Sequence, residues 1–448
     1  MIGLLPISTR KMEFLSREFK MSDMMNYPAL TLKLFLWVLV GALFLSACSA
    51  AQNDRGTNQP SQTRLPADDP TTQASKPVAT ENPASPQESL PLPTLLPDEP
   101  PPAGATNEFS TDFSKHSIPY TEILSGGPPK DGIPAIDDPK FVNVGDADSW
   151  LGDKEPVVFL QIGEDARAYP LQILTWHEIV NDTVGGVPVV VTFCPLCNTA
   201  ITFERTVDGQ VLDFGTTGRL RYSNLVMYDR PTESWWQQAT GEAIAGEFTG
   251  QRLVFRPATI IAWEEFEANY PDGKVLSRET GYTRSYGSNP YVGYDNINNS
   301  PFLYRGPQTP GVLPAVARVL TVDLNGEAVA YPYDILQSLG VVNDAVGGEQ
   351  VVIFWQPGTT SALDAGTIAG GRDVGAAAAF SRQIDLQVLN FVYQGGRILD
   401  DQTGSQWDVF GRAVGGELTG ARLDPVVSVN HFWFSWAAFK PETRIYQP

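Results

Sequence analysis

The chain has few of the residues that build several common kinds of site. Its 448 residues include three cysteines and three histidines, and 31 Lys and Arg stand against 51 Asp and Glu. Three cysteines are too few for a disulfide-stapled scaffold. The formal charge of −20 argues against nucleic acid as a partner, because phosphates attract basic surfaces. A Gly-rich phosphate loop, a Gly-x-Ser-x-Gly elbow and a His-Glu-x-x-His helix are all missing from the sequence, so nucleotide-binding and hydrolase functions lack support.

The N-terminus carries a short apolar run, residues 34–45, behind Lys33. A run of this length is typical of a signal peptide and falls short of the roughly 20 residues that a membrane-spanning helix needs. The ending Leu45-Ser46-Ala47-Cys48 resembles a bacterial lipobox, in which the leader is removed before a cysteine that then carries lipid. We therefore expect residues 1–47 to be a leader, and the protein to be attached to the extracytoplasmic face of a membrane through Cys48.

The segment that follows has the composition of a tether. Proline recurs between Pro60 and Pro102 among Ser, Thr, Gln and Asp, with little apolar periodicity. Such a segment buries too little surface to offset the entropy of ordering it, and proline keeps it extended. We predict a lipidated cysteine with a disordered tether over 48–108, a first half over 109–316 and a second half over 317–448. The hydrophobic content of 42% is enough for a packed core in these halves.

The two halves repeat each other in sequence. The matches are ordered along the chain, as repeats of one structural unit require. The matched groups are Ala168-Tyr169-Pro170 with Ala330-Tyr331-Pro332, Asn181-Asp182 with Asn343-Asp344, Gly185-Gly186 with Gly347-Gly348, Asp229 with Asp400, Trp236 with Trp407, and Gly246-Glu247 with Gly416-Glu417. We predict two related units, about 155–279 and 317–448, packed as one or two globular bodies and joined by a connection rich in Tyr, Gly and Pro.

The pattern within each half predicts a strand-rich α+β fold. Residues 157–162, 189–193 and 200–204 are β-branched and aromatic runs bounded by turn residues, which favours strands. Helical spacing predicts helices over 171–180 and 263–270. Strands and helices do not alternate regularly, so a doubly wound parallel sheet is not expected.

The strongest chemical signal is Cys194-Pro195-Leu196-Cys197, the only cysteines left once Cys48 carries lipid. Two thiols at this spacing can chelate a soft metal ion, act as a redox couple or form a structural disulfide. Redox pairs of the thioredoxin type sit at a helix N-terminus, whereas this pair lies between two predicted strands, as in metal knuckles. A zinc ribbon would need a second cysteine pair, which the chain lacks, so any metal must recruit other ligands.

Comparing matched positions of the two halves indicates candidates for those ligands. Cys194 matches Gln356 and Cys197 matches Thr359, so the second half has lost both thiols; His177 matches Leu339 and Met227 matches Ile398. His177 falls on the apolar face of its predicted helix, where a buried imidazole needs a hydrogen-bond or metal partner. A satisfied core histidine is an equal alternative for His177, and ordinary core variation explains Met227 as well. Cysteine, histidine and methionine together form a soft set suited to copper or zinc.

Other polar residues are interpreted as structural. Glu178 is expected to be a solvated helix residue, and His116 and His431 have no motif around them. The aromatic connection, including Tyr291-Val292-Gly293-Tyr294-Asp295, is expected to be a packed linker. A ligand cleft between the halves is the alternative.

Several of these motifs occur together in one known family. Trp176-His177-Glu178-Ile179-Val180-Asn181-Asp182, Cys194-Pro195-Leu196-Cys197-Asn198-Thr199-Ala200, Met227-Tyr228-Asp229 and Ser234-Trp235-Trp236-Gln237 resemble, in content and order, the bacterial domain of unknown function 3179. The resemblance covers most of residues 109–448 and implies an exported or membrane-attached protein without an assigned activity. Asn198 departs from it, because that family generally has glycine there.

We therefore expect a membrane-anchored extracytoplasmic lipoprotein that binds copper or zinc through Cys194 and Cys197, with His177 and Met227 as further candidate ligands. The alternatives are a thiol–disulfide oxidoreductase that uses the same two cysteines, and a ligand-binding module in which they form a structural disulfide. The membrane is the expected partner, nucleic acid is not, and no protein partner is predicted.

Overall fold

The structure is a computed structural model that describes residues 94–448, all of which belong to one compact unit. The predicted leader, Cys48 and the first part of the tether lie outside the described residues. The predicted boundary of the tether at residue 108 is too late. The backbone N–H of Leu96 donates to the His116 carbonyl at 2.9 Å, Ala105 is buried, and Glu108 pairs with Arg219 at 2.6 Å. Residues 94–108 therefore pack on the body of the protein.

The fold is strand-rich α+β, as the sequence predicts, and its helices are short. They are α1 (Ala105–Glu108), α2 (Val144–Asp148), α3 (Leu171–His177), α4 (Trp263–Asn269), α5 (Tyr333–Leu339) and α6 (Trp433–Ala437), with 3₁₀ turns η1 (Tyr120–Glu122), η2 (Pro195–Cys197) and η3 (Ile368–Gly370). No helix among residues 94–448 has both the length and the apolar character needed to cross a bilayer.

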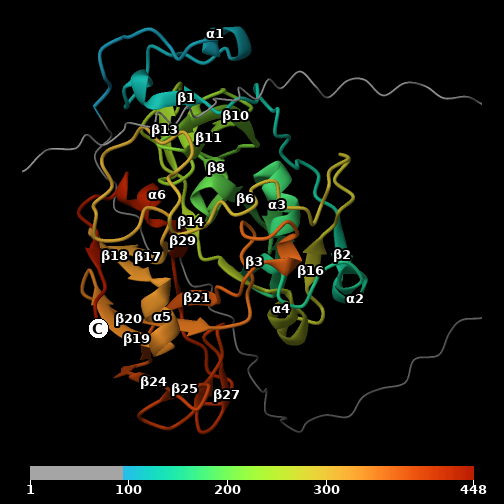
Figure 1. Ribbon diagram of the computed structural model, residues 1–448, viewed down its shortest axis with the longest axis vertical. Helices are drawn as coiled ribbons and strands as arrows, with labels where there is room; N and C mark the ends of the chain where they lie inside the picture. The colour runs from blue at the N-terminus through green and yellow to red at the C-terminus, as the bar shows by residue number, and fades with distance from the viewer. Residues whose placement is uncertain (1–93) are drawn as a thin grey trace, which may run out of the picture. The chain divides into compact units, whose positions relative to one another are not determined.

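Three sheets make up the first half (Figure 1). The outer sheet has the order β15 (Thr259–Ala262), β3 (Pro156–Ile162), β4 (Asp165–Pro170), β16 (Lys274–Leu276), β2 (Phe141–Asn143). The central sheet has the order β14 (Phe255–Arg256), β7 (Thr199–Glu204), β6 (Val187–Cys194), β5 (Ile179–Val184). The third has the order β1 (Ile123–Ser125), β10 (Phe214–Arg221), β11 (Asn224–Asp229), β12 (Trp235–Gln237), β13 (Glu242–Ala245).

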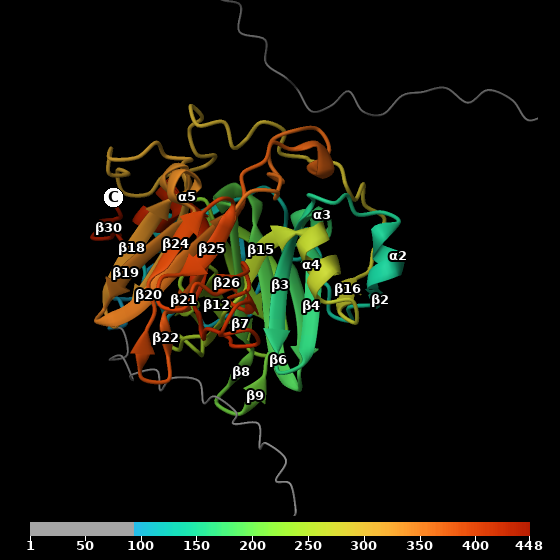
Figure 2. The ribbon, with the colours of Figure 1, turned by 90° about the horizontal axis from the view of Figure 1, so that it is seen from below.

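Three further sheets make up the second half. Figure 2 shows several of their strands, among them β18, β20 and β25. Their orders are β29 (Ser428–Phe432), β17 (Arg318–Leu324), β18 (Glu327–Pro332), β30 (Arg444–Ile445); then β19 (Val341–Val346), β20 (Glu349–Gln356), β21 (Ala376–Ser381), β28 (Pro425–Val426); then β24 (Phe391–Gln394), β25 (Arg397–Asp400), β26 (Gln406–Trp407), β27 (Ala413–Gly415). Two small hairpins pair β8 (Thr206–Val207) with β9 (Gln210–Val211) and β22 (Gln383–Ile384) with β23 (Gln387–Val388).

The two halves have matching strand orders and matching hydrogen bonds. In the first half, β4 leads into α3 and pairs in parallel with β16. In the second half, β18 leads into α5 and pairs in parallel with β30. The indole N–H of Trp236 donates to Asp229 at 2.9 Å, and that of Trp407 donates to Asp400 at the same distance. These aspartates cap a turn and bury an indole, which is a structural role.

Two helix predictions have different outcomes. The helix predicted over 263–270 is confirmed as α4. The helix predicted over 171–180 is too long, because α3 ends at His177 and β5 begins at Ile179. Between them Glu178 has φ 58 and ψ −27, a left-handed conformation that stops a helix. The matching residue after α5 is Gly340, with φ 71.

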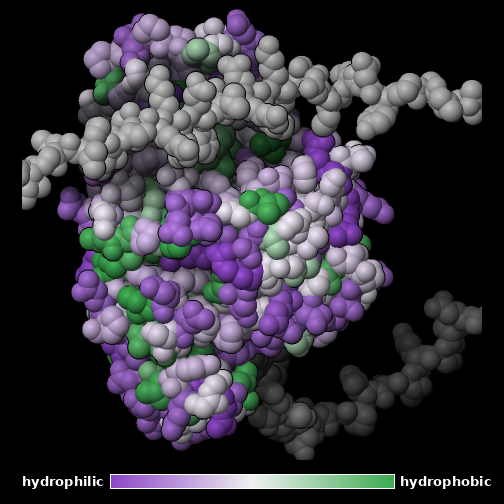
Figure 3. Space-filling model, viewed as in Figure 1, coloured by the Kyte–Doolittle hydropathy of each residue, from purple (hydrophilic) through white to green (hydrophobic). Residues whose placement is uncertain are grey.

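The halves share a core rather than meeting across a polar boundary. One buried cluster contains Cys194, Cys197 and Met227 from the first half together with Phe432 and Phe434 from the second. On the face shown in Figure 3, hydrophobic residues occur in small groups among hydrophilic ones. Apolar burial is the main favourable term in folding, so this shared cluster binds the two halves into one body.

The connection between the halves is held by a buried acidic residue. Asp295 is 1% exposed in its side chain; it pairs with Arg318 at 2.7 Å and Arg372 at 2.8 Å, and it accepts from the Ser361 hydroxyl at 2.5 Å. Burial opposes ionisation, but the two guanidinium groups and the hydroxyl hold the pKa of Asp295 below its usual value. Residues 287–295 thereby run along residues 361–368 of the second half.

Replacing Asp295 with Asn should loosen this attachment. The variant leaves Arg318 buried without its counter-charge, which costs roughly 3–5 kcal/mol for a fully buried pair; we expect the lower end because Arg372 is 45% exposed. The matched control is Asp364→Asn, which removes a more exposed partner of Arg372 and should change the free energy of unfolding by at most about 1 kcal/mol. Denaturant unfolding measures both, and equal effects would contradict the assignment.

Candidate functional site

The two cysteines lie at one end of the central sheet, between strands as the sequence predicts. Cys194 is the last residue of β6, η2 carries the chain through Pro195 to Cys197, and β7 begins at Thr199. Cys194 and Thr199 remain paired across the turn. Asn198 closes the turn with φ 50 and ψ 39, a left-handed conformation that asparagine tolerates better than most residues. In the second half, β20 and β21 are instead joined by the long loop 357–375.

Both thiols are buried against the turn between β10 and β11. Cys194 is 2% exposed and Cys197 is 0% exposed, and neither is in a disulfide. The Ser223 carbonyl oxygen lies 3.9 Å from Cys194 Sγ and 3.3 Å from Cys197 Sγ. Ser223 and Tyr222 have φ values of 68 and 54, so two non-glycine residues hold left-handed conformations directly above the sulfurs. Positive φ at both residues is the usual geometry of a two-residue hairpin turn, here between β10 and β11.

Nitrogen donors also point at the sulfurs. The Asn224 side-chain amide donates to Cys197 Sγ at 3.4 Å, and the Leu225 backbone N–H donates to the sulfur of Cys194. Burial, followed by the neighbouring Cys197 thiol and the charge of Glu178, raises the pKa of Cys194 well above its usual value. The Cys194 thiol is therefore protonated at neutral pH in the unliganded protein. A soft cation that replaces the proton would find these N–H donors in place to stabilise the thiolate.

A buried amide network surrounds Asn224. Its Nδ2 atom donates to Gln238 Oε1 at 2.8 Å as well as to Cys197, and its Oδ1 atom accepts from Gln237 Nε2 at 2.5 Å. Gln238 in turn donates to the Thr199 carbonyl at 3.2 Å. Because every one of these side chains is fully buried, their hydrogen bonds fix the orientation of the Asn224 amide toward the sulfur.

His431 joins this network from the second half. Its Nδ1 atom lies 2.9 Å from the Thr199 hydroxyl, which donates to the Cys197 carbonyl at 3.1 Å. The hydroxyl must therefore accept from Nδ1–H. Burial lowers the pKa of His431 to about 3, so the ring is neutral at physiological pH. His431 positions the turn that carries Cys197, a role without a sequence motif.

His177 has other partners than the cysteines. It is fully buried in α3, as its helix position predicts. Its Nδ1 atom lies 2.7 Å from the Pro134 carbonyl, so Nδ1 carries the hydrogen, and Nε2 accepts from the Tyr286 hydroxyl at 2.6 Å. Both ring nitrogens are thus occupied, and burial lowers the pKa of the ring. The arrangement is that of a satisfied core histidine.

Met227 is buried in the same part of the core as the cysteines. It is fully buried on β11, pairs across the sheet with Trp236, and belongs to the buried cluster that contains Cys194 and Cys197. Among residues 94–448 no three His, Cys, Asp or Glu side chains are grouped so that they could hold a metal ion.

Glu178 is the site residue that sequence reasoning misplaced. Glu178 was expected to be a solvated helix residue, but it is only 8% exposed. Burial raises the pKa of its carboxyl group to about 8. Its charge acts on the thiol of Cys194 and on Tyr291. The carboxyl group makes no hydrogen bond or ion pair with any other residue of the described range 94–448. The signal available in the sequence was the mismatch with Gly340, which marks a position where glutamate is conformationally costly.

A cavity of about 700 Å³ opens in front of Glu178. Its walls come from residues 126–133, from β10 and from the connection at 290–303, and Leu196 of the knuckle reaches it. Gly218 brings two of these walls together: it has φ 69, and an added Cβ would lie 2.0 Å from the Pro128 carbonyl. The connecting segment was expected to be a packed linker. Its residues Tyr291 and Tyr294 also line this cavity of the first half.

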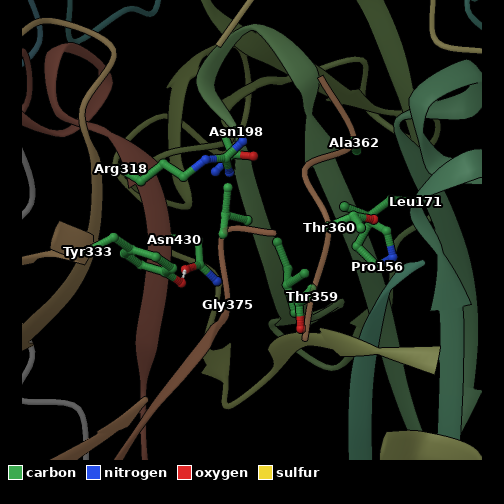
Figure 4. Close-up of a pocket in the computed structure, with 12 residues that line it drawn as sticks. Pro156, Leu171, Asn198, Arg318, Tyr333, Thr359, Thr360, Ala362, Gly375 and Asn430 are labelled. Atoms are coloured by element: carbon green, nitrogen blue, oxygen red, sulfur yellow. Dashed lines mark hydrogen bonds between the residues drawn. The ribbon is translucent and has the colours of Figure 1, made fainter. Parts of the chain in front are cut away.

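The cavity that both halves line is much smaller. It measures about 20 Å³ and lies where Asn198 faces Arg318 and Thr359, with Tyr333 donating to Asn430 at its edge (Figure 4). This volume suits about one water molecule.

A model of a known protein family matches most of the described chain. The model, described as a protein of unknown function (DUF3179), matches residues 130–443. The chain belongs to the DUF3179 family. This confirms the resemblance drawn from the motifs, and the matched range contains the knuckle, Glu178 and both halves. No curated protein and no solved structure matches the chain.

Glu178 should make the stability of this DUF3179 protein depend on pH. A folded-state pKa of about 8 above an unfolded value near 4.3 gives stability that is complete below the unfolded pKa and lost as the pH rises through 8. Glu178→Gln imitates the protonated carboxyl group, so from pH 6 to pH 9 it should lose about 2.7 kcal/mol less stability than the wild type. Denaturant unfolding at both pH values, with exposed Glu264→Gln as control, measures this. Parallel losses in wild type and Glu178→Gln would contradict it.

Proposed function

We propose that this DUF3179 protein binds one soft, low-coordinate metal ion, copper(I), through Cys194 and Cys197. The single observation that carries the proposal is the pair of adjacent, buried, free thiols with N–H donors from Asn224 and Leu225 directed at the sulfurs. Copper(I) favours thiolate and thioether ligands. Metal binding would displace the thiol protons, whose loss burial otherwise opposes.

Copper is favoured over zinc by the set of donors. Structural zinc is almost always held by four ligands from Cys, His, Asp and Glu, and such a group is missing among residues 94–448. Two thiolates and a thioether are suitable ligands for copper(I), and Met227 lies in the same buried cluster as the thiols. His177 drops out of the proposed ligand set because both of its nitrogens are engaged elsewhere.

The thiol–disulfide oxidoreductase alternative is less well supported. Its attacking group must be a thiolate that a partner can reach. Both thiols are buried, and the pKa of Cys194 is raised rather than lowered. A pair isolated as a disulfide that never binds metal would favour the remaining alternative, a structural disulfide.

Two wider parts of the proposal rest on the sequence. We propose that the halves are diverged copies of one unit, supported by their matching strand orders, and that the site survives only in the first. We also propose that the protein is an envelope lipoprotein anchored through Cys48, which lies outside the described residues. A metal carrier or an assembly factor on the outer side of a membrane fits this placement.

The test is a copper(I) titration of the anaerobically reduced full chain against a chromophoric copper(I) chelator, with elemental analysis and free-thiol counting on the protein as isolated. One copper per chain is expected. The double variant Cys194→Ser, Cys197→Ser should lose at least a hundredfold in affinity, about 2.7 kcal/mol. Copper binding by the double variant as tight as that of the wild type would sink the proposal.

The second half of the chain supplies matched variants. Met227→Ile installs the residue that the second half has at this place and should weaken copper binding about tenfold, or about 1.4 kcal/mol. His177→Leu, matched to Leu339, should leave copper affinity within about twofold while lowering the free energy of unfolding by roughly 1–3 kcal/mol, because partners of the ring lose hydrogen bonds. A loss of copper affinity in His177→Leu, with unchanged affinity in Met227→Ile, would reverse these two assignments.

A further inference from the structure

The cavity in front of Glu178 adjoins the knuckle through Leu196, but neither cysteine is among its lining residues. Most of its lining is apolar or aromatic, and the connecting segment forms one wall. The apolar and aromatic lining residues include Ile133, Leu196, Leu220, Tyr291, Tyr294 and Phe302. A volume of about 700 Å³ is within the range of small-molecule sites, which combine such walls with a few polar groups.

The charged groups of the lining are Glu178 and Arg219. The charge of Arg219 is already paired, because its Nη2 atom lies 2.6 Å from Glu108, although its buried Nε atom has no hydrogen-bond partner among residues 94–448. Glu178 is nine-tenths buried, lines the cavity and has no hydrogen-bond or ion-pair partner among residues 94–448. A buried carboxyl group of this kind is costly unless something pairs with it.

Aromatic rings line the cavity together with this carboxyl group. Burial, followed by the charge of Glu178, raises the pKa of Tyr291, and Tyr294 and Phe302 line the same cavity. Aromatic faces attract cations through their quadrupole, most strongly where water is excluded. A single unpaired carboxyl group beside such rings is the chemistry that recognises organic ammonium ions.

We infer that this cavity binds an organic ammonium ion with an apolar body, its cationic nitrogen paired with Glu178 and flanked by Tyr291 and Tyr294. The ligand supplies the counter-charge that the described part of the chain does not. The apolar walls from β10 and from residues 290–303 enclose the rest of the ligand. Neither Cys194 nor Cys197 takes part in this recognition.

The test compares a cation with its neutral carbon isostere. Choline, benzyltrimethylammonium and 3,3-dimethylbutan-1-ol, the isostere of choline, are titrated into the full chain by calorimetry at pH 8.5, with a chelator present to keep metal out. Both cations should bind, and choline should bind at least tenfold tighter than its isostere. Equal binding of choline and the isostere, or no binding of either cation at millimolar concentration, would overturn the inference.

Variants locate the site. Glu178→Gln should weaken choline at least tenfold and leave the isostere unchanged, whereas Glu265→Gln, which alters a partly buried carboxyl group outside the cavity, should change neither. Full choline affinity in folded Glu178→Gln would overturn the inference. Should that variant not fold, nuclear Overhauser contacts between the N-methyl protons and the rings of Tyr291 and Tyr294 in the wild type decide the matter, because their absence at saturating choline overturns it as well.

The double variant Cys194→Ser, Cys197→Ser separates this inference from the proposed function. Choline affinity should stay within about twofold in that variant while copper binding is lost. Loss of choline binding in the double variant, with its fold intact, would contradict the independence of the two sites.

Discussion

The arrangement of the first half depends on one left-handed residue. Glu178 ends α3 and allows β5 to begin at the next position, so a helix and the edge of the central sheet meet without a loop. The same conformation buries its carboxyl group beside Cys194 and at the wall of the cavity. The second half has Gly340 there, the residue that adopts such a conformation most easily. A glutamate that bears this strain agrees with a role beyond folding.

The knuckle is held by polar groups that are themselves buried. Asn224 points at Cys197 because Gln237 and Gln238 fix its amide, and Thr199 links the knuckle to His431 of the second half. The atoms that face the knuckle find partners in this buried network, whereas Gln237 Oε1 and His431 Nε2 are buried without a hydrogen-bond partner among residues 94–448. The second half is thus part of the support of the site, although it contains no cysteine.

The segment that connects the two halves does more than link them. Asp295 fixes it to the second half through Arg318 and Arg372. Close by, Tyr291 and Tyr294 face the cavity of the first half. One segment therefore ties the halves together and closes a binding space, and a buried ion pair is suited to fix its position because either partner alone would be costly.

The sequence by itself determined the strand-rich fold class, the family, the strand–turn–strand setting of the Cys194–Cys197 pair and the inward direction of His177. These follow from local periodicity, turn residues and motif order, which act over a few neighbours. Only the tertiary structure decided that His177 is satisfied by Pro134 and Tyr286, and that Glu178 is buried and unpaired. Burial and hydrogen-bond partners come from segments far apart along the chain, and no local pattern specifies which of them meet.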